Sequence, residues 1–366
     1  MSEIGLYLHI PFCRSKCPYC DFYSFICKDD GIKDTYCAAL QQKISSSETT
    51  LQRKADTLYI GGGTPSVLGA KRLVSLVNTA KSELLTDSAE ITVECNPYGL
   101  NMDFFKELAA SGVNRISMGL QSAAPGERRI LGRLADRKAI ENVINSAREA
   151  GIENISLDVM LGIPKQTEKT LSETLDFCIS SGVPHISAYI LKLEENTPFY
   201  KNRSKFEFPD DDLTADLYLQ MCESLTDSGL LQYEISNFSR KGFESRHNLK
   251  YWHCEEYLGL GAAAHSFIDG KRFYYERDLE SFINGASPIP DGNGGDFTEY
   301  SMLALRLTEG LCESKVLERF GHKIPDEMRK KAQIFVNNGY MESDEKGLRF
   351  TRKGFLLSNS ILAEIL

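Results

Sequence analysis

The feature of this chain that most constrains its fold is a regular alternation of two kinds of sequence between residues 4 and 192. Short runs rich in β-branched and aromatic residues are typical of strands. Longer runs with helical spacing separate them, and several of these end in glycine, as helices often do. Strands that alternate with helices predict parallel β-α-β units and an α/β fold. The six strand-like runs are IGLYLHI, DTLYI, EITVEC, RISMGL, NISLDVML and HISAYIL.

Polar residues at the ends of these runs distinguish a barrel from an open sheet. In a β/α barrel all strands end at one mouth, whereas an open sheet has its site at a single switch point. Here polar residues stand at or just beyond the end of every predicted strand. We therefore predict a partial, TIM-like (β/α)6 barrel over residues 1–205. The polar segments are HIPFC, GGGTPS, Glu94 with the following NP, Gln121, Asp158 and Tyr189.

Two further regions follow the alternation. Residues 206–295 contain one predicted helix, an irregular segment rich in aromatic residues and glycine, and the turn-rich stretch SPIPDGNGG, which is typical of a linker. Residues 296–366 are predicted to form a helix, a turn, a second helix, two short strands and a last helix. This order predicts a small winged-helix-like α+β domain at the C-terminus.

Charge and hydropathy exclude several classes of protein. With 51 acidic and 42 basic residues the net charge is -9, and the two signs are nearly balanced in the C-terminal region. We therefore expect no nucleic-acid partner, and we expect the C-terminal domain to act as a docking or lid module. No apolar run approaches the roughly 18 residues of a membrane span, and we expect no signal peptide. Ten cysteines in such a chain favour metal or redox chemistry in the cytoplasm.

Three of these cysteines follow the first predicted strand with the spacing CxxxCxxC: Cys13, Cys17 and Cys20. A structural zinc ion normally takes four ligands, and no fourth ligand is evident nearby. An iron–sulfur cluster also usually takes four thiolates, so a cluster held by three has one iron open to an exchangeable ligand. The spacing alone is compatible with an iron–sulfur cluster, a zinc site or ordinary buried thiols.

A second motif, YIGGGTPS, places three glycines at the end of the second predicted strand. Glycine permits a tight turn, and it also permits close approach of the backbone to a ligand. The spacing is neither that of the phosphate-binding loop nor that of the dinucleotide fingerprint. By itself the motif is compatible with a simple turn or with a cradle for a small polar group.

Together, the two motifs resemble those of the radical S-adenosylmethionine (SAM) superfamily. The resemblance implies a [4Fe–4S] cluster held by Cys13, Cys17 and Cys20, whose fourth iron is chelated by the amino and carboxylate groups of SAM. In that superfamily the reduced cluster cleaves SAM to methionine and a 5′-deoxyadenosyl radical. The protein positions the cluster and SAM and excludes water from them.

The segments YLHIPFCRSKCPYCDF and GGGTPS resemble, within this superfamily, the family of oxygen-independent coproporphyrinogen III oxidase and its relatives. The resemblance extends over essentially the whole chain. Carried over by position, this resemblance implies a set of SAM contacts in which Arg133 pairs with the SAM carboxylate. The implied contacts are Tyr7, Tyr19, Gly62, Gly63, Thr64, Glu94, Gln121, Arg133 and Asp158.

Two departures separate this chain from the oxidases of that family. The oxidases carry a fourth cysteine two residues after the third, and Phe22 stands at that position here. They also have a substantial N-terminal extension, and we expect none here because the first predicted strand begins near Ile4. Coproporphyrinogen III oxidase activity is therefore not expected.

A third motif, HNLKYW at residues 247–252, contains the only tryptophan of the chain. Alone, it is compatible with ordinary aromatic packing around an incidental histidine. It is also compatible with a heme site, because neutral imidazole is a common axial ligand of heme iron. The pattern HNxxYW resembles the signature of the heme chaperone family HemW, whose members share the phenylalanine after the cysteines and lack the extension. The resemblance implies heme binding through His247.

We therefore expect a cytoplasmic heme chaperone on a radical SAM scaffold. Its expected partners are heme, heme-accepting proteins, an electron donor if SAM is cleaved, and membrane-bound acceptors contacted peripherally. His253 and His265 flank a glycine-rich segment, and we interpret them as loop or core residues that could assist a heme site. The alternatives are a radical SAM enzyme acting on coproporphyrinogen III or a related tetrapyrrole, and a regulator that binds nucleic acid through the C-terminal domain.

Overall fold

The computed structural model describes residues 3–366, and the side chains of all of these except residues 48–50. Its centre is a run of six adjacent parallel strands, and each of them coincides with a run predicted from the sequence. Most of their residues are buried, as expected for parallel strands covered on both faces. In spatial order these strands are β1 (Ile4–Ile10), β4 (Ala55–Gly62), β5 (Leu85–Cys95), β6 (Arg115–Gln121), β7 (Asn154–Leu161) and β8 (His185–Ile190).

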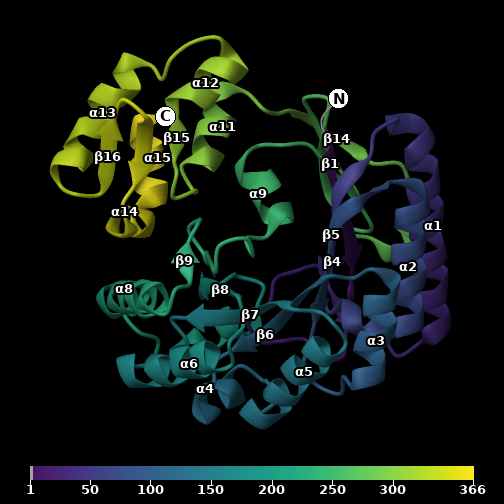
Figure 1. Ribbon diagram of the computed structural model, residues 1–366. Coiled ribbons are helices and arrows are strands. Elements are labelled where there is room, and N and C mark those ends of the chain that lie inside the picture. Colours follow the sequence, from purple (N-terminus) through teal and green to yellow (C-terminus); the bar gives the residue numbers. More distant parts are fainter. Residues whose placement is uncertain (1–2) are drawn as a thin grey trace.

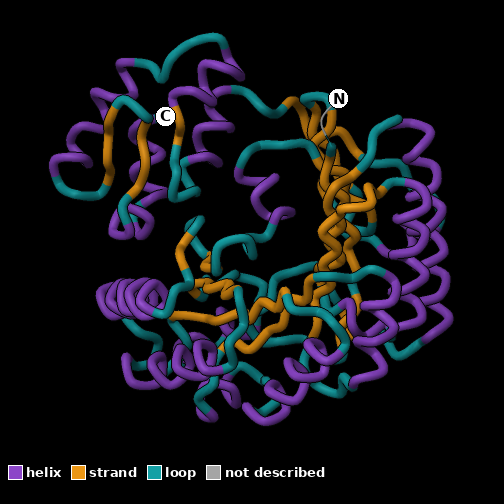
Figure 2. The backbone as a smooth tube through the Cα atoms, viewed as in Figure 1, coloured by secondary structure: helices purple, strands orange, loops and turns teal. Residues whose placement is uncertain are grey.

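The six strands form a partial barrel that does not close. They turn from upright at β1 to nearly flat at β7, and helices cover the outer side (Figures 1 and 2). Asn101 and Asp136 cap the N-termini of two of these helices with their side chains, and Gly112 ends one of them in the left-handed conformation. The predicted fold class is confirmed. The outer helices are α1 (Asp30–Leu51), α2 (Ala70–Glu83), α3 (Met102–Ser111), α4 (Pro125–Ile130), α5 (Arg137–Glu149), α6 (Glu168–Ser180) and α8 (Asp211–Asp227).

Strands from later in the chain extend both edges of the sheet. On one side β11 (Tyr257–Leu260) runs parallel to β1, and β12 (His265–Ile268), β13 (Lys271–Tyr274) and β14 (Ile289–Asn293) continue it antiparallel. On the other side β10 (Asn237–Ser239) and β9 (Leu231–Gln232) follow β8. The stretch that we predicted as a linker contains β14. Its proline and glycines are accommodated because β14 is an edge strand.

Short elements complete the central part of the chain. The helix α9 (Arg246–Trp252) carries the HNLKYW motif and packs against β4 and the C-terminal domain; it lies in the middle of Figure 1. The remaining short elements are β2 (Phe12–Cys13), β3 (Phe25–Ile26), η1 (Pro65–Leu68), α7 (Pro198–Lys201), η2 (Arg203–Lys205) and α10 (Leu279–Ile283).

The C-terminal region folds as helices around a three-stranded sheet (Figure 1, yellow-green). Two of its strands were predicted from the sequence, and the third, a two-residue strand that pairs with one of them, was not. Arg319 joins it to the central part by donating to the carbonyl oxygens of His253 and Cys254 at 3.2 and 3.0 Å. No helix in the described part of the chain is both long and apolar enough to cross a membrane. Its elements are α11 (Phe297–Ala304), β15 (Leu311–Cys312), α12 (Glu313–Phe320), α13 (Asp326–Asn337), β16 (Met341–Asp344), β17 (Gly347–Phe350), α14 (Arg352–Leu356) and α15 (Ser358–Ile365).

Candidate functional site

The three cysteines of the first motif lie on one loop at the barrel mouth. Cys13 ends β2 and is buried, whereas Cys17 and Cys20 lie in the loop before β3 and are half-buried. All three are free thiols. His9 holds the loop against β1, because its Nε2 lies 2.9 Å from the carbonyl oxygen of Tyr23. The loop therefore presents three thiols in a fixed position beside the end of β1.

Among the described residues, no group of three or more His, Cys, Asp or Glu side chains lies close enough together to hold one metal ion. Three thiols suit an iron–sulfur cluster that leaves one iron open to another ligand, whereas a structural zinc ion normally takes four protein ligands.

The glycine motif lies directly beside the cysteine loop. Gly62 has a φ of +112°, and a Cβ there would lie 2.6 Å from the ring of His9. A Cβ on Gly63 would lie 2.7 Å from the carbonyl oxygen of Phe12 and 3.1 Å from Cys13 Sγ. The hydroxyl of Thr64 donates to Cys13 Sγ at 3.6 Å. Glycine is thus required at both positions for the end of β4 to reach the thiols.

Glu94 stands next to this glycine turn, at the end of β5. Its Oε1 accepts a hydrogen bond from Tyr59 Oη at 2.8 Å, and its Oε2 accepts one from the Gly62 amide at 3.1 Å. Burial raises the pKa of Glu94 to about 7. The carboxylate can therefore take up or release a proton near neutral pH, and a bound cation would favour the charged form.

A second polar group lies across the barrel, on β6, on β7 and in the segment that follows β6. Asp158 accepts a hydrogen bond from Ser117 Oγ at 3.1 Å, and burial raises the pKa of Asp158 to about 6. Arg133 and Gln121 lie over Gly119, because a Cβ there would fall 2.8 and 2.9 Å from their terminal nitrogens. These residues thus share one end of the barrel.

Arg133 and Tyr19 lie side by side in this group, with Cys17 close to the Tyr19 hydroxyl. Among the described residues, the buried Arg133 Nε has no acceptor of its own. Buried polar groups in proteins are almost always paired, so an unpaired guanidinium nitrogen at a barrel mouth indicates a missing ligand with acceptor atoms. A carboxylate is such a ligand. The residues at the mouth therefore fit SAM, which carries an amino group, a carboxylate and a positive charge.

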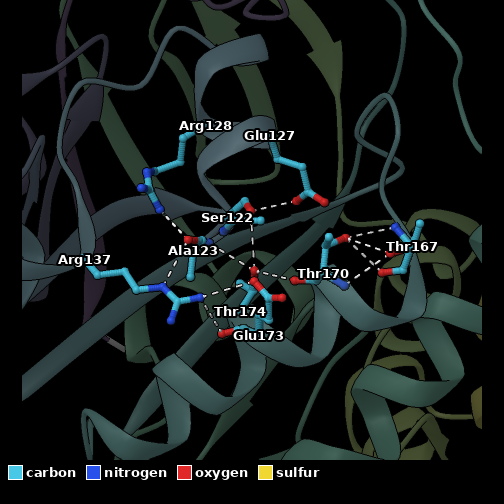
Figure 3. Close-up of polar contacts among 10 residues, drawn as sticks. Ser122, Ala123, Glu127, Arg128, Arg137, Thr167, Thr170, Glu173 and Thr174 are labelled. Carbon is cyan, nitrogen blue, oxygen red and sulfur yellow. Dashed lines mark hydrogen bonds and ion pairs between the residues drawn. The ribbon is translucent and has the colours of Figure 1, made fainter.

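A polar network fixes the chain just beyond Gln121 (Figure 3). Ser122 Oγ donates to Glu127 at 2.6 Å, and the Ala123 amide donates to Thr174 Oγ1 at 3.0 Å. The Ala123 carbonyl oxygen accepts from Arg128 and, at 3.1 Å, from Arg137 Nε. Gln121 itself has a φ of +66°. The network accounts for how this strained position is held.

The HNLKYW helix enters the barrel from the N-terminal ends of the strands. Glu90, on β5, accepts hydrogen bonds from the amides of Arg246 and His247, both at 3.1 Å. Lys250 forms an ion pair with Asp56 at 2.9 Å. Both contacts tie α9 to β4 and β5, so the helix fills the interior between the two edges of the sheet.

His247, predicted as a heme ligand, is enclosed by protein. Its Nδ1 lies 2.8 Å from Thr57 Oγ1, its Nε2 lies 2.8 Å from Tyr251 Oη, and its ring stacks on Tyr59. Burial lowers the pKa of His247 to about 3, so the imidazole is neutral. Only 1% of the residue is exposed. In this structure both ring nitrogens are engaged, and coordination of iron would require the Tyr251 hydroxyl to move away.

A cavity of about 310 Å³ joins the barrel mouth to the HNLKYW helix. Gly62, Glu94 and Tyr7 line it on the side of the mouth, and Tyr251 lines it on the side of α9. Tyr257, His265 and Arg277 complete it from the added strands and the loop after them, and the sequence did not identify these residues as a group. Tyr257 and His265 flank the segment LGLGAAA, and that spacing is compatible with a return of the chain to the same place.

Comparison with known proteins identifies the family. The radical SAM superfamily matches residues 7–178, and the HemN C-terminal domain matches residues 298–357. The heme chaperone HemW of Bacillus subtilis is 33% identical over 98% of both chains. The chain belongs to the HemW family. The HemW protein of Escherichia coli is 32% identical to it over 99% of this chain and 98% of its own.

A solved structure supports the fold of this HemW-family chain. The radical SAM enzyme coproporphyrinogen III oxidase (HemN) of Escherichia coli superposes with a TM-score of 0.86, covers 99% of this chain and 90% of its own, and is 24% identical. This similarity concerns the fold. The family predicted from CxxxCxxC, Phe22 and HNxxYW is confirmed, and so are the superfamily's cofactors, a [4Fe–4S] cluster and SAM.

Proposed function

We propose that this protein is a heme chaperone, which binds heme and transfers it to acceptor proteins, and which carries a [4Fe–4S] cluster and SAM in the same partial barrel. The observation that carries the proposal is the cavity that joins the barrel mouth to Tyr251 of the HNLKYW helix. Four tyrosines and one phenylalanine are among its lining residues, and such side chains suit the flat apolar face of a porphyrin. Full-length relatives named heme chaperones support the same function.

We assign the cluster to Cys13, Cys17 and Cys20 and SAM to the polar residues around them. When bound, these groups would supply reductive cleavage of SAM. The chain's own residues hold and orient them: the glycine turn admits the amino end, and Arg133 offers its unpaired Nε to the carboxylate. The remaining SAM contacts that we propose are Tyr7, Tyr19, Gly62, Gly63, Thr64, Glu94, Gln121 and Asp158.

The HNLKYW helix contributes to the heme site, in this proposal, through Tyr251. His247 accepts or donates one hydrogen bond on each side and holds the Tyr251 hydroxyl in place at 2.8 Å. The phenol of Tyr251 then forms part of the cavity wall. His247 thus affects heme binding by positioning Tyr251, and it can contact heme directly only if Tyr251 moves.

We also propose how the three regions divide the work. Residues 1–205 hold the cluster and SAM, residues 206–295 supply the heme segment, and residues 296–366 dock acceptors or cover the barrel. The partners are heme-accepting proteins, some of them bound to membranes, and an electron donor if SAM is cleaved. We propose a cytoplasmic location, which the ten free cysteines support.

One anaerobic experiment tests the proposed function. The cluster is reconstituted, heme is titrated while spectra are recorded, and coproporphyrinogen III turnover is assayed with SAM and a reductant. We expect about one heme per chain and no turnover. Robust turnover, or no saturable heme binding, would overturn the proposal. Turnover would favour the alternative of a radical SAM enzyme acting on a tetrapyrrole.

A further inference from the structure

The cavity is lined by two histidines, and they differ in what their ring nitrogens do. His9 has both nitrogens engaged, by Tyr7 Oη at 3.0 Å and by the Tyr23 carbonyl oxygen at 2.9 Å. His265 has no hydrogen-bond or ion-pair partner for its ring among the described residues, and its side chain is exposed. His265 is therefore the imidazole of this cavity that is free to bind a metal, whereas His247 lies behind Tyr251.

His265 is also held rigidly by its surroundings. It opens β12 and pairs with Tyr274 of β13, and its ring stacks on the Tyr274 ring with centroids 5.3 Å apart. The next residue, Ser266, accepts a hydrogen bond from the Gly259 amide at 2.9 Å, which fixes β12 against β11. A free imidazole on a fixed strand is the arrangement that an axial ligand needs, because little freedom is lost when iron binds.

The other walls of the cavity match the rest of a heme. Tyr251 and Tyr257 pack edge to face with centroids 4.6 Å apart, and Phe22 lies at the rim with 69% of its surface exposed. Arg277 lines the same cavity, is exposed, and has no carboxylate partner among the described residues. A guanidinium binds a carboxylate through two parallel hydrogen bonds, and heme carries two propionates.

We propose that His265 is the axial ligand of the heme iron in this cavity and that Arg277 pairs with a heme propionate. This inference rests on the proposed function, since it names the residues that hold the heme. It also gives the position Phe22 a role: the residue that stands where the oxidases carry a fourth cysteine becomes an apolar edge of the heme site.

Heme binding and spectra of reconstituted variants test the axial ligand. His265→Ala should weaken heme binding by roughly tenfold or more and remove the nitrogen-ligand signature in electron paramagnetic resonance and resonance Raman spectra. Added imidazole should restore that signature. His322→Ala, an exposed histidine of the C-terminal domain, serves as the matched control and should behave as the wild type.

The outcomes separate this inference from the proposed function. If the wild type binds no heme, the proposed function fails. If the wild type binds heme and His265→Ala gives the same affinity and spectrum, the function stands and the inference is overturned. A folded His265→Ala protein whose lost signature imidazole does not restore also contradicts ligation. Circular dichroism reports whether the variant is folded, and His265→Met, which should change the ligand signature without emptying the position, provides the second variant.

Arg277→Gln tests the propionate contact independently. It should weaken heme binding by roughly tenfold but leave binding of heme dimethyl ester, which lacks the charged propionates, unchanged. Equal weakening of both ligands, or no weakening of either, would contradict the pairing of Arg277 with a propionate.

Discussion

The hydroxyl of Tyr251 lies 2.8 Å from Nε2 of His247, while the Tyr251 side chain lines the cavity that we assign to heme. The tyrosine therefore separates the histidine of the HNLKYW motif from the cavity. Experiments can show whether Tyr251 or His247 contacts the heme.

Tyr251→Phe removes the hydroxyl that bonds His247 Nε2 and keeps the aromatic wall of the cavity. We expect a loss of about 1–2 kcal/mol in the free energy of unfolding, because the variant leaves a buried imidazole nitrogen unpaired. Heme affinity should not increase. If His247 binds the iron, loss of the Tyr251 hydroxyl should instead free Nε2 of His247 and tighten heme binding. A heme titration measures the affinity, and chemical denaturation measures the stability.

Glu90→Ala tests how α9 is held. The carboxylate of Glu90 accepts hydrogen bonds from the amides of Arg246 and His247. These amides belong to the first turn of α9 and have no acceptor within the helix. We expect a loss of about 2 kcal/mol in the free energy of unfolding and weaker heme binding. Glu107→Ala, at an exposed position on α3, is the matched control. Equal stability of the two variants in urea denaturation would show that Glu90 does not anchor α9.

Gly63→Ala tests the contact between the glycine turn and the thiols. An added Cβ would lie 2.7 Å from the Phe12 carbonyl oxygen and 3.1 Å from Cys13 Sγ, so the cysteine loop must shift. We expect a destabilisation of about 1–3 kcal/mol and less than full cluster loading, measured as iron and sulfide per chain. Gly126→Ala, whose Cβ would meet nothing within 4 Å, should load as the wild type does. Full loading of both variants would refute the close approach.

Glu94 predicts a pH dependence of SAM binding. Burial raises the pKa of Glu94 to about 7, and a cation bound beside it favours the charged form. SAM affinity should therefore rise with pH from 6 to 7, by up to about tenfold per pH unit, and level off above 7. Glu94→Gln should weaken binding and remove this rise. Isothermal titration calorimetry checks it, and an unchanged slope in the variant would assign the proton to another group.

The same carboxyl group affects stability with the opposite sign. The pKa of Glu94 rises from 4.5 in the unfolded chain to about 7 in the folded one, so the folded state binds more protons between these values. Its contribution to the free energy of unfolding falls as pH rises through this window. Glu94→Gln should reduce that fall, which denaturation at pH 5, 6 and 8 measures.

The sequence predicted the barrel strands because each is a buried apolar run that local pattern alone reveals. It also placed the thiols and the glycine turn at one mouth, since parallel strands end together. It did not reveal that β11 lies beside β1, because the pairing of Gly5 with Tyr257 joins residues about 250 positions apart. For the same reason the cavity formed by Tyr251, His265 and Arg277 became visible only in the structure.

The surroundings of His247 in the HNLKYW motif could not be predicted from the sequence. A histidine within HNxxYW indicated a heme ligand, but the pattern carries no information on what surrounds the ring. The bonds from His247 to Thr57 and Tyr251 depend on the entry of α9 into the barrel, which Glu90 and Asp56 on distant strands fix.

Hydrogen–deuterium exchange of the reconstituted protein with and without heme tests the central claim most directly, namely that heme occupies the side of the cavity formed by Tyr251, His265 and Arg277, next to the SAM contacts. The account predicts that one equivalent of heme slows exchange in residues 246–260 and 263–277 and in the cysteine loop around Phe22. Protection confined to residues 296–366, with none around the cavity, would contradict it.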